Sequence, residues 1–425
     1  MTMIGENDST RQDFAPAATL PQSAGVTGSD NWRSVDSSSN VSVTLRGQVL
    51  EGTTLVDRLS KDWDELFARV PQASYSLSRA WQGCFIQSAS RCAHPLAITI
   101  WSGGRLVSLL TLETRRRAGL RVAQPVGTSH PGHIGLLAEP QYAAGAAEVA
   151  AALCLEQRLF HVFTLHDVAS DDYPTQHFAE TLARRGLGVW RVPRTVCRRA
   201  MLRSTIDEYL LANKSAKSRQ TLRRKERQLH KAGAVRIEYL RGPEITPAVL
   251  ERITRVRSES WMKRRGASLL DSTFERTCLQ RLAEADILRA WFLTLNGDDA
   301  ACIVATVTNG LLEYRYPAFK LAYEHLSVGQ VLLQQSIADA CRERVLVYDF
   351  GQGDADYKRF WANDCHYIER VFVGRGPIGA GVAAGLALAW RAVRNPTVRR
   401  IAKAVVRRPH EGAPASEGDA AAPDR

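Results

Sequence analysis

Two Asn-Gly pairs, Asn296-Gly297 and Asn309-Gly310, constrain the fold of this chain more than any other feature of its sequence. Each pair lies between runs of apolar and β-branched residues. An Asn-Gly pair in that setting is the strongest short-range signal for a β-hairpin, because both turn residues must adopt positive φ angles. We therefore predict an antiparallel meander of three strands, formed by Leu288 to Leu295, Ala301 to Val307 and Leu311 to Phe319.

The elements expected after this meander alternate between helix and strand. A polar loop over Tyr323 to Gln330 leads into a helix over Val331 to Arg342, and a strand, a helix and a last strand over Arg370 to Val373 follow. A weaker copy of the meander lies at Ala97 to Thr111, where a glycine-containing turn joins two apolar runs. The sequence thus predicts an α/β fold of two tandem, related halves, each a mixed, mainly antiparallel sheet flanked by helices.

The length of 425 residues exceeds one ordinary domain and favours two cores of about 150 residues each. We place the N-terminal half at 41–203 and the C-terminal half at 204–375. Residues 1–40 and 411–425 have the composition of disordered tails, and 376–410 that of a basic amphipathic helix.

The charge balance favours an anionic partner. The chain is 45% hydrophobic and 24% charged, which excludes a mostly disordered or mostly membrane-embedded protein. Its net charge of +12 fits a phosphate-bearing cofactor, a nucleic acid or a lipid surface. The most basic segment, Lys214 to Lys231, is a predicted helix with a single acid, Glu226. That helix could present a solvated face or bind phosphates, and it lacks the aromatic residues of single-strand nucleic-acid sites.

A second basic segment lies near the C-terminus. The apolar run Pro377 to Trp390 is followed by arginines and lysines up to Arg408, so residues 377–408 could lie on an anionic membrane surface or pack against the protein. We expect no membrane span, because we find no apolar run of ~18–20 residues.

The cysteines and the N-terminus indicate a cytoplasmic protein. The eight cysteines are scattered without the close spacing of zinc or redox motifs, so we expect reduced, mostly buried thiols. The N-terminal residues lack the basic start and apolar core of a signal peptide. We expect a cytoplasmic protein, at most peripheral at the inner face of a membrane.

Two histidines, His130 and His133, lie in the loop Gly127 to Gly135. They could be metal ligands or an acid–base pair. A zinc site needs at least three protein ligands, and no third lies nearby in the sequence. We therefore expect loop histidines that line a cleft, and no metal.

Polar side chains gather after the run Val345 to Phe350, at a predicted strand end, where α/β folds tend to bind ligands. Asp349, Asp354, Tyr357 and Lys358 are the candidates. The structural alternative is that Asp349 caps a turn and that Tyr357 and Lys358 only begin a helix.

A second candidate site lies upstream, at the loop that precedes the helix over Val331 to Arg342. The N–H groups at a helix N-terminus can bind a pyrophosphate. The residues in that position are Ser327, Val328, Gly329 and Gln330. A plain turn is the alternative reading of this loop.

These features resemble a known family. The run Asp349 to Asp354 with Tyr357-Lys358, preceded by Tyr314, Tyr316, Tyr323 and the loop Ser327 to Leu333, resembles the BioF-like acetyltransferase domain of the CelD/BcsL cellulose-biosynthesis group. That group belongs to the GNAT superfamily and is similar to the FemAB transferases, which carry two GNAT-like halves. The resemblance covers about 41–375 and is most specific from Leu288 to Val373.

The resemblance implies transfer of an acyl group, most simply acetyl, from acyl-CoA to an amine acceptor, often in exopolysaccharide or cell-envelope pathways. The coenzyme A pyrophosphate would bind at Ser327 to Gln330. An amine that attacks a thioester must lose a proton, and the tetrahedral intermediate needs hydrogen-bond donors.

The candidate residues take different roles in that chemistry. Asp349 is the first candidate base and Asp354 the second, Tyr357 could protonate the leaving thiolate, and Lys358 could neutralise an anion. The expected cleft-lining residues are Trp261, Arg265, Tyr314 and Tyr316.

Two other functions remain open. A FemAB-like transferase would take its donor from aminoacyl-tRNA, with the basic helix Lys214 to Lys231 as the contact surface. A catalytically silent partner of a membrane-bound polysaccharide synthase would use the basic C-terminal helix.

Overall fold

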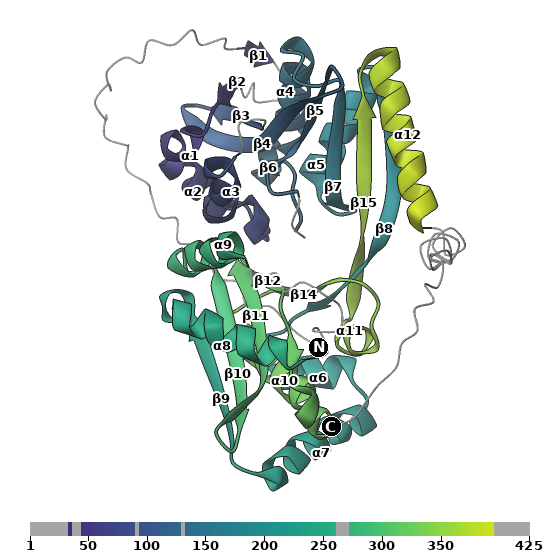
Figure 1. Ribbon diagram of the computed structural model, residues 1–425. Coiled ribbons are helices and arrows are strands. Elements are labelled where there is room, and N and C mark those ends of the chain that lie inside the picture. The colour runs from purple at the N-terminus through teal and green to yellow at the C-terminus, as the bar shows by residue number, and fades with distance from the viewer. Residues whose placement is uncertain (1–32, 36–43, 90–92, 129–131, 261–271, 395–425) are drawn as a thin grey trace, which may run out of the picture. The chain divides into compact units, whose positions relative to one another are not determined.

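The computed structural model describes residues 33–35, 44–89, 93–128, 132–260 and 272–394 (Figure 1). Its strands are β1 (Arg33–Val35), β2 (Leu45–Glu51), β3 (His94–Ser102), β4 (Arg105–Arg117), β5 (Leu120–Pro125), β6 (Leu137–Ala138), β7 (Val162–Ala169), β8 (Gly188–Met201), β9 (Val235–Arg241), β10 (Leu288–Leu295), β11 (Asp298–Thr308), β12 (Leu311–Tyr314), β13 (Ala318–Phe319), β14 (Val347–Gln352) and β15 (Asp364–Gly374). Its α-helices are α1 (Leu55–Arg58), α2 (Ser60–Arg69), α3 (Arg79–Gln87), α4 (Ala143–Glu156), α5 (Tyr173–Arg184), α6 (Ile206–Asn213), α7 (Ala216–Ala232), α8 (Pro247–Ser258), α9 (Thr273–Glu284), α10 (Val328–Arg342), α11 (Asp356–Trp361) and α12 (Gly376–Arg394).

The strands form one continuous, mostly antiparallel sheet. Their order is β1-β2-β3-β4-β5-β7-β15-β8-β14-β12-β11-β10-β9, while β6 pairs with β4 and β13 pairs with β11. Each half contains one parallel pair, β5–β7 in the N-terminal half and β12–β14 in the C-terminal half, and a helix precedes the second strand of each pair. This confirms the predicted fold class, an α/β fold of two halves with a mixed, mainly antiparallel sheet flanked by helices.

The predicted meander is confirmed as β10, β11 and β12. The φ angles are 53° at Asn296 and 85° at Gly297, and 48° at Asn309 and 85° at Gly310, as a tight hairpin turn with two positive φ angles requires. The third strand ends at Tyr314, earlier than predicted. The N–H groups of Arg315 and Tyr316 both donate to the carbonyl of Val304, and the strand resumes only as β13.

Helices cover both faces of the C-terminal sheet. Along β10, Trp291 and Leu293 lie in the core on the α10 face, whereas Ala290 and Phe292 lie in the core that contains α8 and α9. This alternation follows from the two-residue period of a strand. The sheet is therefore buried on both sides at β10, which explains why the residues of this strand from Ala290 to Leu293 are all apolar.

The two halves exchange strands at their boundary. β15, near the C-terminus, pairs with β7 and β8 in the N-terminal sheet, and β8 in turn pairs with β14 of the C-terminal half. Figure 1 shows β8 and β15 side by side over their length. Residue 203, where we expect a boundary, lies between β8 and α6, and the segment 204–375 contributes its last strand, β15, to the sheet beside β7 and β8.

Three predictions about the chain ends change. Arg33–Val35 form strand β1 against β2, although we expected 1–40 to be disordered. The apolar C-terminal segment forms a 19-residue helix, α12, where we had counted a shorter apolar run. The stretch Gly376–Val393 has a mean hydropathy of 1.3 and is, by length and composition alone, long and apolar enough to cross a membrane, so our premise that the chain has no apolar stretch of this length was wrong. The residues of the predicted C-terminal tail, and 395–410, lie outside the described residues.

Candidate functional site

The site forms where β12 and β14 separate. Their parallel pairing lasts from Leu311–Val347 to Glu313–Asp349, after which the register of β14 becomes irregular. The carboxyl ends of this pair therefore diverge, which leaves room for a ligand between two strands that would otherwise hydrogen-bond to each other. Two cavities open at this position.

The first, here called the helix cavity, has a volume of about 460 Å³ and lies at the N-terminus of α10. The predicted loop forms part of its lining. It is lined by Cys302, Ile303, Tyr314, Pro317, Ala318, Phe319, Glu324, Ser327, Val328, Gly329, Gln330, Leu333 and Tyr357. The structure thus brings all four residues of the predicted pyrophosphate loop to one cavity.

The backbone at the start of α10 is arranged to bind an anion. Ser327 has a φ of 57°, and its left-handed conformation turns the chain from the short 3-10 helix Leu321–Leu326 into α10. The N–H groups of Val328 and Gly329 have no backbone acceptor within the described part of the chain, as expected for the first turn of a helix. A Cβ atom at Gly329 would lie 3.1 Å from Phe319, so glycine also keeps the cavity open.

The basic helix α7 lies beside this cavity. Lys225 donates from Nζ to Oε1 of Gln330, which places an ammonium next to the start of α10. Helix α7 packs through Leu222 and Leu229 and exposes Lys217, Arg223, Arg224, Arg227 and Lys231. The basic segment is thus mainly a solvated face, which is one of the two alternatives that the sequence predicts. It contacts the candidate anion site through Lys225.

The second cavity, here called the carboxylate cavity, has a volume of about 340 Å³. It shares three lining residues with the helix cavity, Tyr314, Pro317 and Tyr357, so the two are neighbours. Its full lining is Gly132, His133, Asp167, Cys197, Arg257, Glu313, Tyr314, Arg315, Tyr316, Pro317, Asp349, Phe350, Gly351, Gln352, Tyr357 and Lys358.

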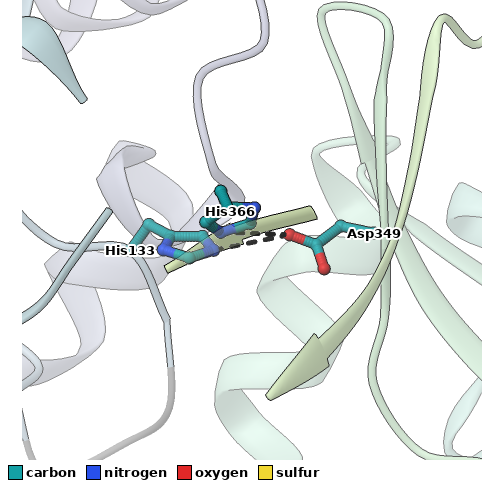
Figure 2. Close-up of side chains that lie close together, drawn as sticks. All are labelled: His133, Asp349 and His366. Carbon is teal, nitrogen blue, oxygen red and sulfur yellow. Dashed lines mark ion pairs between the residues drawn. The ribbon is translucent and has the colours of Figure 1, made fainter. Parts of the chain in front are cut away.

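Asp349 lies at the centre of the carboxylate cavity and is buried. Its Oδ1 accepts a hydrogen bond of 2.6 Å from the N–H of Gly351, as the turn-capping alternative predicts. Its Oδ2 faces two imidazoles, at 3.5 Å from His133 Nε2 and 3.9 Å from His366 Nε2 (Figure 2). Asp349 therefore caps the turn with one oxygen and presents the other to the cavity.

The imidazoles change the acidity of this cluster. Burial would raise the pKa of Asp349, but its interaction with the nearby His133 and the charges of both histidines outweigh burial and lower that pKa. Burial would lower the pKa of His133, yet Asp349 raises it above its ordinary value. The pKa of His366 is lowered, mainly because the ring is buried.

A second buried carboxylate, Glu313, lies on the adjacent strand in register with Asp349. Ser74 Oγ donates to both of its oxygens, at 2.9 and 3.0 Å, and the N–H of Tyr75 donates to Oε2 at 3.1 Å. Burial nevertheless raises the pKa of Glu313, and the charge of Asp349 acts in the same direction. Neighbouring carboxylates with pKa values shifted in opposite directions are a frequent feature of acid–base sites.

Arginines supply positive charge on the opposite wall. Arg257 is 4% exposed, and its Nε and Nη1 have no hydrogen-bond partner within the described residues. Its guanidinium lies 5.3 Å from the centre of the Tyr316 ring. A buried guanidinium with unpaired N–H groups at a cavity wall is suited to bind a carboxylate or phosphate.

The other predicted catalytic residues are Tyr357 and Lys358, which line the cavities, and Asp354, which does not. Tyr357 lies between the two cavities, and burial raises its pKa to about 12. Lys358 is 8% exposed and donates to the carbonyls of Gly351 and Gln352, at 3.2 and 2.6 Å, so it holds the turn after β14.

Asp354 does not line either cavity. Its carboxylate pairs with Arg198 and Arg359 in the exposed part of the turn. The geometry therefore removes Asp354 as a candidate base.

The predicted cleft-lining residues are only partly described. Tyr314 and Tyr316 line the carboxylate cavity as expected. Trp261, Arg265 and His130 lie outside the described residues. His133 lines the cleft as expected, although its partners come from β14 and β15.

Sequence reasoning missed Arg257, Glu313 and His366. Glu313 carried a signal, because an acid between Leu312 and Tyr314 interrupts an otherwise apolar strand. His366 carried none, because its strand joins the site only through the exchange of β15 between the halves. Arg257 looks like an ordinary basic residue of an amphipathic helix.

The N-terminal half has a different arrangement at the corresponding position. The chain entering α4 carries Glu139, a buried carboxylate that pairs with Arg69 at 2.8 Å and Arg105 at 3.0 Å. At Gly145, a Cβ would lie 2.7 Å from Leu45, because α4 packs closely on β2. The candidate site thus belongs to the C-terminal half, with His133 contributed by the N-terminal half.

Comparisons with known proteins agree with this fold. No curated protein sequence matches the chain. Among solved structures, FemX matches with a TM-score of 0.54 at 11% identity, covering 73% of this chain and 95% of FemX, which shows a shared fold. The C-terminal domain of a putative lysylphosphatidylglycerol synthetase from Agrobacterium fabrum matches with a TM-score of 0.48 at 10% identity over 78% of this chain and 95% of that one. A tandem GNAT protein from the clavulanic acid biosynthesis pathway matches with a TM-score of 0.41 at 13% identity over 78% and 99%.

A family model matches the part of the chain that forms most of the site. Residues 216–359, from α7 to α11, match the model of the acetyltransferase (GNAT) domain. This segment contains the α10 loop, Glu313 and Asp349. This part of the C-terminal half is therefore similar to a GNAT acetyltransferase domain.

Proposed function

We propose that this protein is an N-acyltransferase that moves an acyl group, most simply acetyl, from acyl-CoA to an amine. The observation that carries the proposal is the pair of neighbouring cavities, one at a helix N-terminus and one around a buried carboxylate and imidazole, with Tyr314, Pro317 and Tyr357 between them. This arrangement suits a reaction in which donor and acceptor enter from two sides.

The helix cavity would bind the donor. The N–H groups of Val328 and Gly329 and the start of the α10 dipole favour the pyrophosphate of coenzyme A. Lys225, beside Gln330, adds a positive charge. The thioester would then point toward Tyr314 and Tyr357, at the boundary with the carboxylate cavity.

The carboxylate cavity would bind the acceptor and receive its proton. Neutral His133 can accept a proton at Nε2, and Asp349 stabilises the imidazolium that forms, which is why the pKa of His133 is raised. Tyr357, protonated at neutral pH, can donate a hydrogen bond to the leaving thiolate. In this mechanism, Asp349 acts through His133.

Arg257 supports an acceptor that carries an anionic group beside its amine. Its unpaired N–H groups and its burial in the cavity wall suit a carboxylate or phosphate. Amino acids, aminosugar phosphates and related envelope or exopolysaccharide precursors have this chemistry, and the resemblance to the CelD/BcsL group gives the same expectation.

The proposal is tested by incubating the purified full-length chain with acetyl-CoA and longer acyl-CoAs in the presence of amino acids and aminosugars. Release of free thiol that depends on the acceptor, with a product heavier by one acyl group, is the expected result. Absence of thiol release with every donor, from protein that circular dichroism shows to be folded, would contradict the proposal.

Helix α7 favours a second candidate, in which aminoacyl-tRNA is the donor. It exposes a row of cations, Lys217, Arg223, Arg224, Arg227 and Lys231, against the single acid Glu226. Binding of tRNA that weakens steeply with salt, and that R223E/R227E abolishes, would support this candidate. Binding of acetyl-CoA without measurable affinity for tRNA would eliminate it.

Helix α12 supports attachment of the protein to an anionic membrane surface. Ala383 and Ala387 face the protein, and Arg370 lies 3.7 Å from the centre of the Trp390 ring, whereas Ile378, Leu388 and Val393 are 60–70% exposed. Arg391 and Arg394 follow at the end of the helix. An exposed apolar face that ends in cations matches the chemistry of an anionic lipid surface.

Co-sedimentation with lipid vesicles tests this attachment. We expect binding to vesicles containing phosphatidylglycerol, weaker binding to phosphatidylcholine vesicles, and loss of binding in I378D/V382D. The control L211D removes an equally exposed leucine from α6, and it should bind as the wild type does. No binding to either vesicle would contradict attachment, and extraction resistance to carbonate would indicate a membrane span instead.

A further inference from the structure

His133, Asp349 and His366 form a compact cluster that the proposed acyl transfer does not fully explain. One ligand atom from each residue lies within 4.8 Å of the other two. Figure 2 shows both imidazoles directed at the same carboxylate oxygen. The acyl-transfer mechanism uses His133 and Asp349 but gives His366 no role.

The separations in this cluster are too long for direct hydrogen bonds. The two Nε2–Oδ2 distances are 3.5 Å for His133 and 3.9 Å for His366, whereas N–H···O bonds fall at about 2.7–3.2 Å. Ligand atoms bound tetrahedrally to a zinc-sized ion at about 2.05 Å lie about 3.3 Å apart. The two distances to Asp349 are closer to the edge of such a tetrahedron, and the imidazole nitrogens, which lie within 4.8 Å of each other, would have to move closer together on binding an ion.

The hydrogen bonding of His133 orients a lone pair toward the cluster. Its Nδ1 lies 3.4 Å from the carbonyl oxygen of Asp167, which can only accept, so the tautomer that is protonated at Nδ1 suits this position. In that tautomer the lone pair of Nε2 faces the carboxylate of Asp349, and either a proton or a metal ion between the two groups removes their repulsion. A backbone carbonyl that orients the far nitrogen is the usual outer contact of a metal-binding histidine.

His366 provides an independent observation. The residue is 4% exposed, and neither of its ring nitrogens has a hydrogen-bond partner in the described ranges. Burying a polar group without a partner is costly. A metal ion at Nε2 would satisfy one of these nitrogens.

We propose that His133, Asp349 and His366 form a binding site for a divalent cation of the Zn²⁺ class. Two imidazoles and a carboxylate are a ligand set that such ions accept, with the fourth position open to the carboxylate cavity. The ligands come from the loop before β6, from β14 and from β15. A bound ion therefore links the N-terminal half to the C-terminal half at the strand exchange, and it stabilises the folded state.

The test uses tag-free, full-length protein, made metal-free by dialysis against a chelator, and needs no acyl donor. Titration with Zn²⁺ should give one site per chain, Co²⁺ should give visible absorption bands of a four-coordinate ion, and Zn²⁺ should raise the melting temperature. H133Q, D349N and H366Q should each weaken binding at least 100-fold and abolish the thermal shift.

The matched control is H177Q, which alters a histidine beside Glu148 and Glu180 outside the cluster and should leave Zn²⁺ binding unchanged. D349N keeps the shape of the side chain, so it remains informative if a histidine variant fails to fold. No binding of Zn²⁺, Co²⁺ or Ni²⁺ by folded wild-type protein would overturn the proposal, as would binding that survives in all three variants. These metal assays contain no acyl donor, so either result is read separately from the acyl-transfer assay. A bound ion would occupy the Nε2 lone pair that His133 uses in the proposed mechanism, so Zn²⁺ is expected to inhibit acyl transfer.

Discussion

Nε2 of His133 lies 3.5 Å from Oδ2 of Asp349, and this contact connects a loop of the N-terminal half to a strand of the C-terminal half. It places an imidazole and a carboxylate on the wall of one cavity, although the two residues are far apart in the sequence. The active site we propose therefore depends on both halves of the chain.

The first prediction concerns this pair. D349N and H133Q should each lower kcat for acyl transfer about 100-fold or more, since general-base catalysis contributes about 10²–10⁴. The double variant should be little worse than either single one, because the two residues act as a unit. Steady-state kinetics of the three variants measures this. If the losses of the two single variants add up in the double variant, the residues act separately. D354N is the control: it alters a carboxylate outside the cavities and should retain the wild-type kcat.

The second prediction concerns the charge beside α10. K225A should raise the KM for acyl-CoA several-fold and leave kcat nearly unchanged, because Lys225 is expected to contact the donor's phosphates rather than the reacting atoms. The effect should shrink at high salt. Initial rates across a range of donor concentrations measure it, with K61A on α2 as the charge-matched control. An unchanged KM at low salt would place the pyrophosphate elsewhere.

The third prediction concerns acceptor choice. R257K should raise the KM for an anionic amine acceptor at least tenfold, since lysine cannot reproduce the paired N–H groups of a guanidinium. The same variant should hardly affect the corresponding methyl ester. Comparing kcat/KM for acid and ester in both proteins measures the preference. An equal loss for the two acceptors would mean that Arg257 has a structural role.

The fourth prediction concerns Lys358. K358M should lower the free energy of unfolding by about 2 kcal/mol, because the half-buried carbonyls of Gly351 and Gln352 lose a charged donor. The KM for acyl-CoA should stay near the wild-type value. Urea denaturation and donor kinetics together check this, with K61M as an exposed control. Unchanged stability with a large rise in KM would instead support the phosphate role expected from the sequence.

The fifth prediction concerns the pH dependence of stability. The folded-state pKa of Glu313 is raised by burial, so the stability it contributes is fully present below its unfolded-state pKa and is lost as pH rises through the folded-state pKa. E313Q does not titrate and should lack this loss. Relative to the wild type, E313Q should therefore gain stability on going from acid to neutral pH in urea denaturation. A relative loss over the same range would contradict the raised pKa.

The parts of the fold set by neighbouring residues could be predicted from the sequence. Asn296-Gly297 and Asn309-Gly310 specify their turns by their own φ preferences, and the loop before α10 follows from one glycine and the helix after it. These are local effects, so no knowledge of strand order is needed. The candidate pyrophosphate loop was found for the same reason.

The rest depends on which distant segments pair. The place of β15 between β7 and β8 brings His366 to Asp349, and no spacing along the chain reports that pairing. The burial of Arg257 and Glu313 likewise follows from tertiary packing. This is why the sequence offered two loop histidines without a third ligand, whereas the structure brings together a cluster of three groups.

Binding of acetyl-CoA to wild-type protein and to G329V, measured by isothermal titration calorimetry, tests the central claim most directly. A valine at position 329 would push its side chain into Phe319 and the helix cavity and crowd the N–H groups that we assign to the pyrophosphate. We predict one acetyl-CoA bound per wild-type chain and an affinity at least tenfold lower for G329V, at unchanged circular dichroism. Equal affinity of the two proteins, or no binding by either, would contradict the assignment of this site to acyl-CoA.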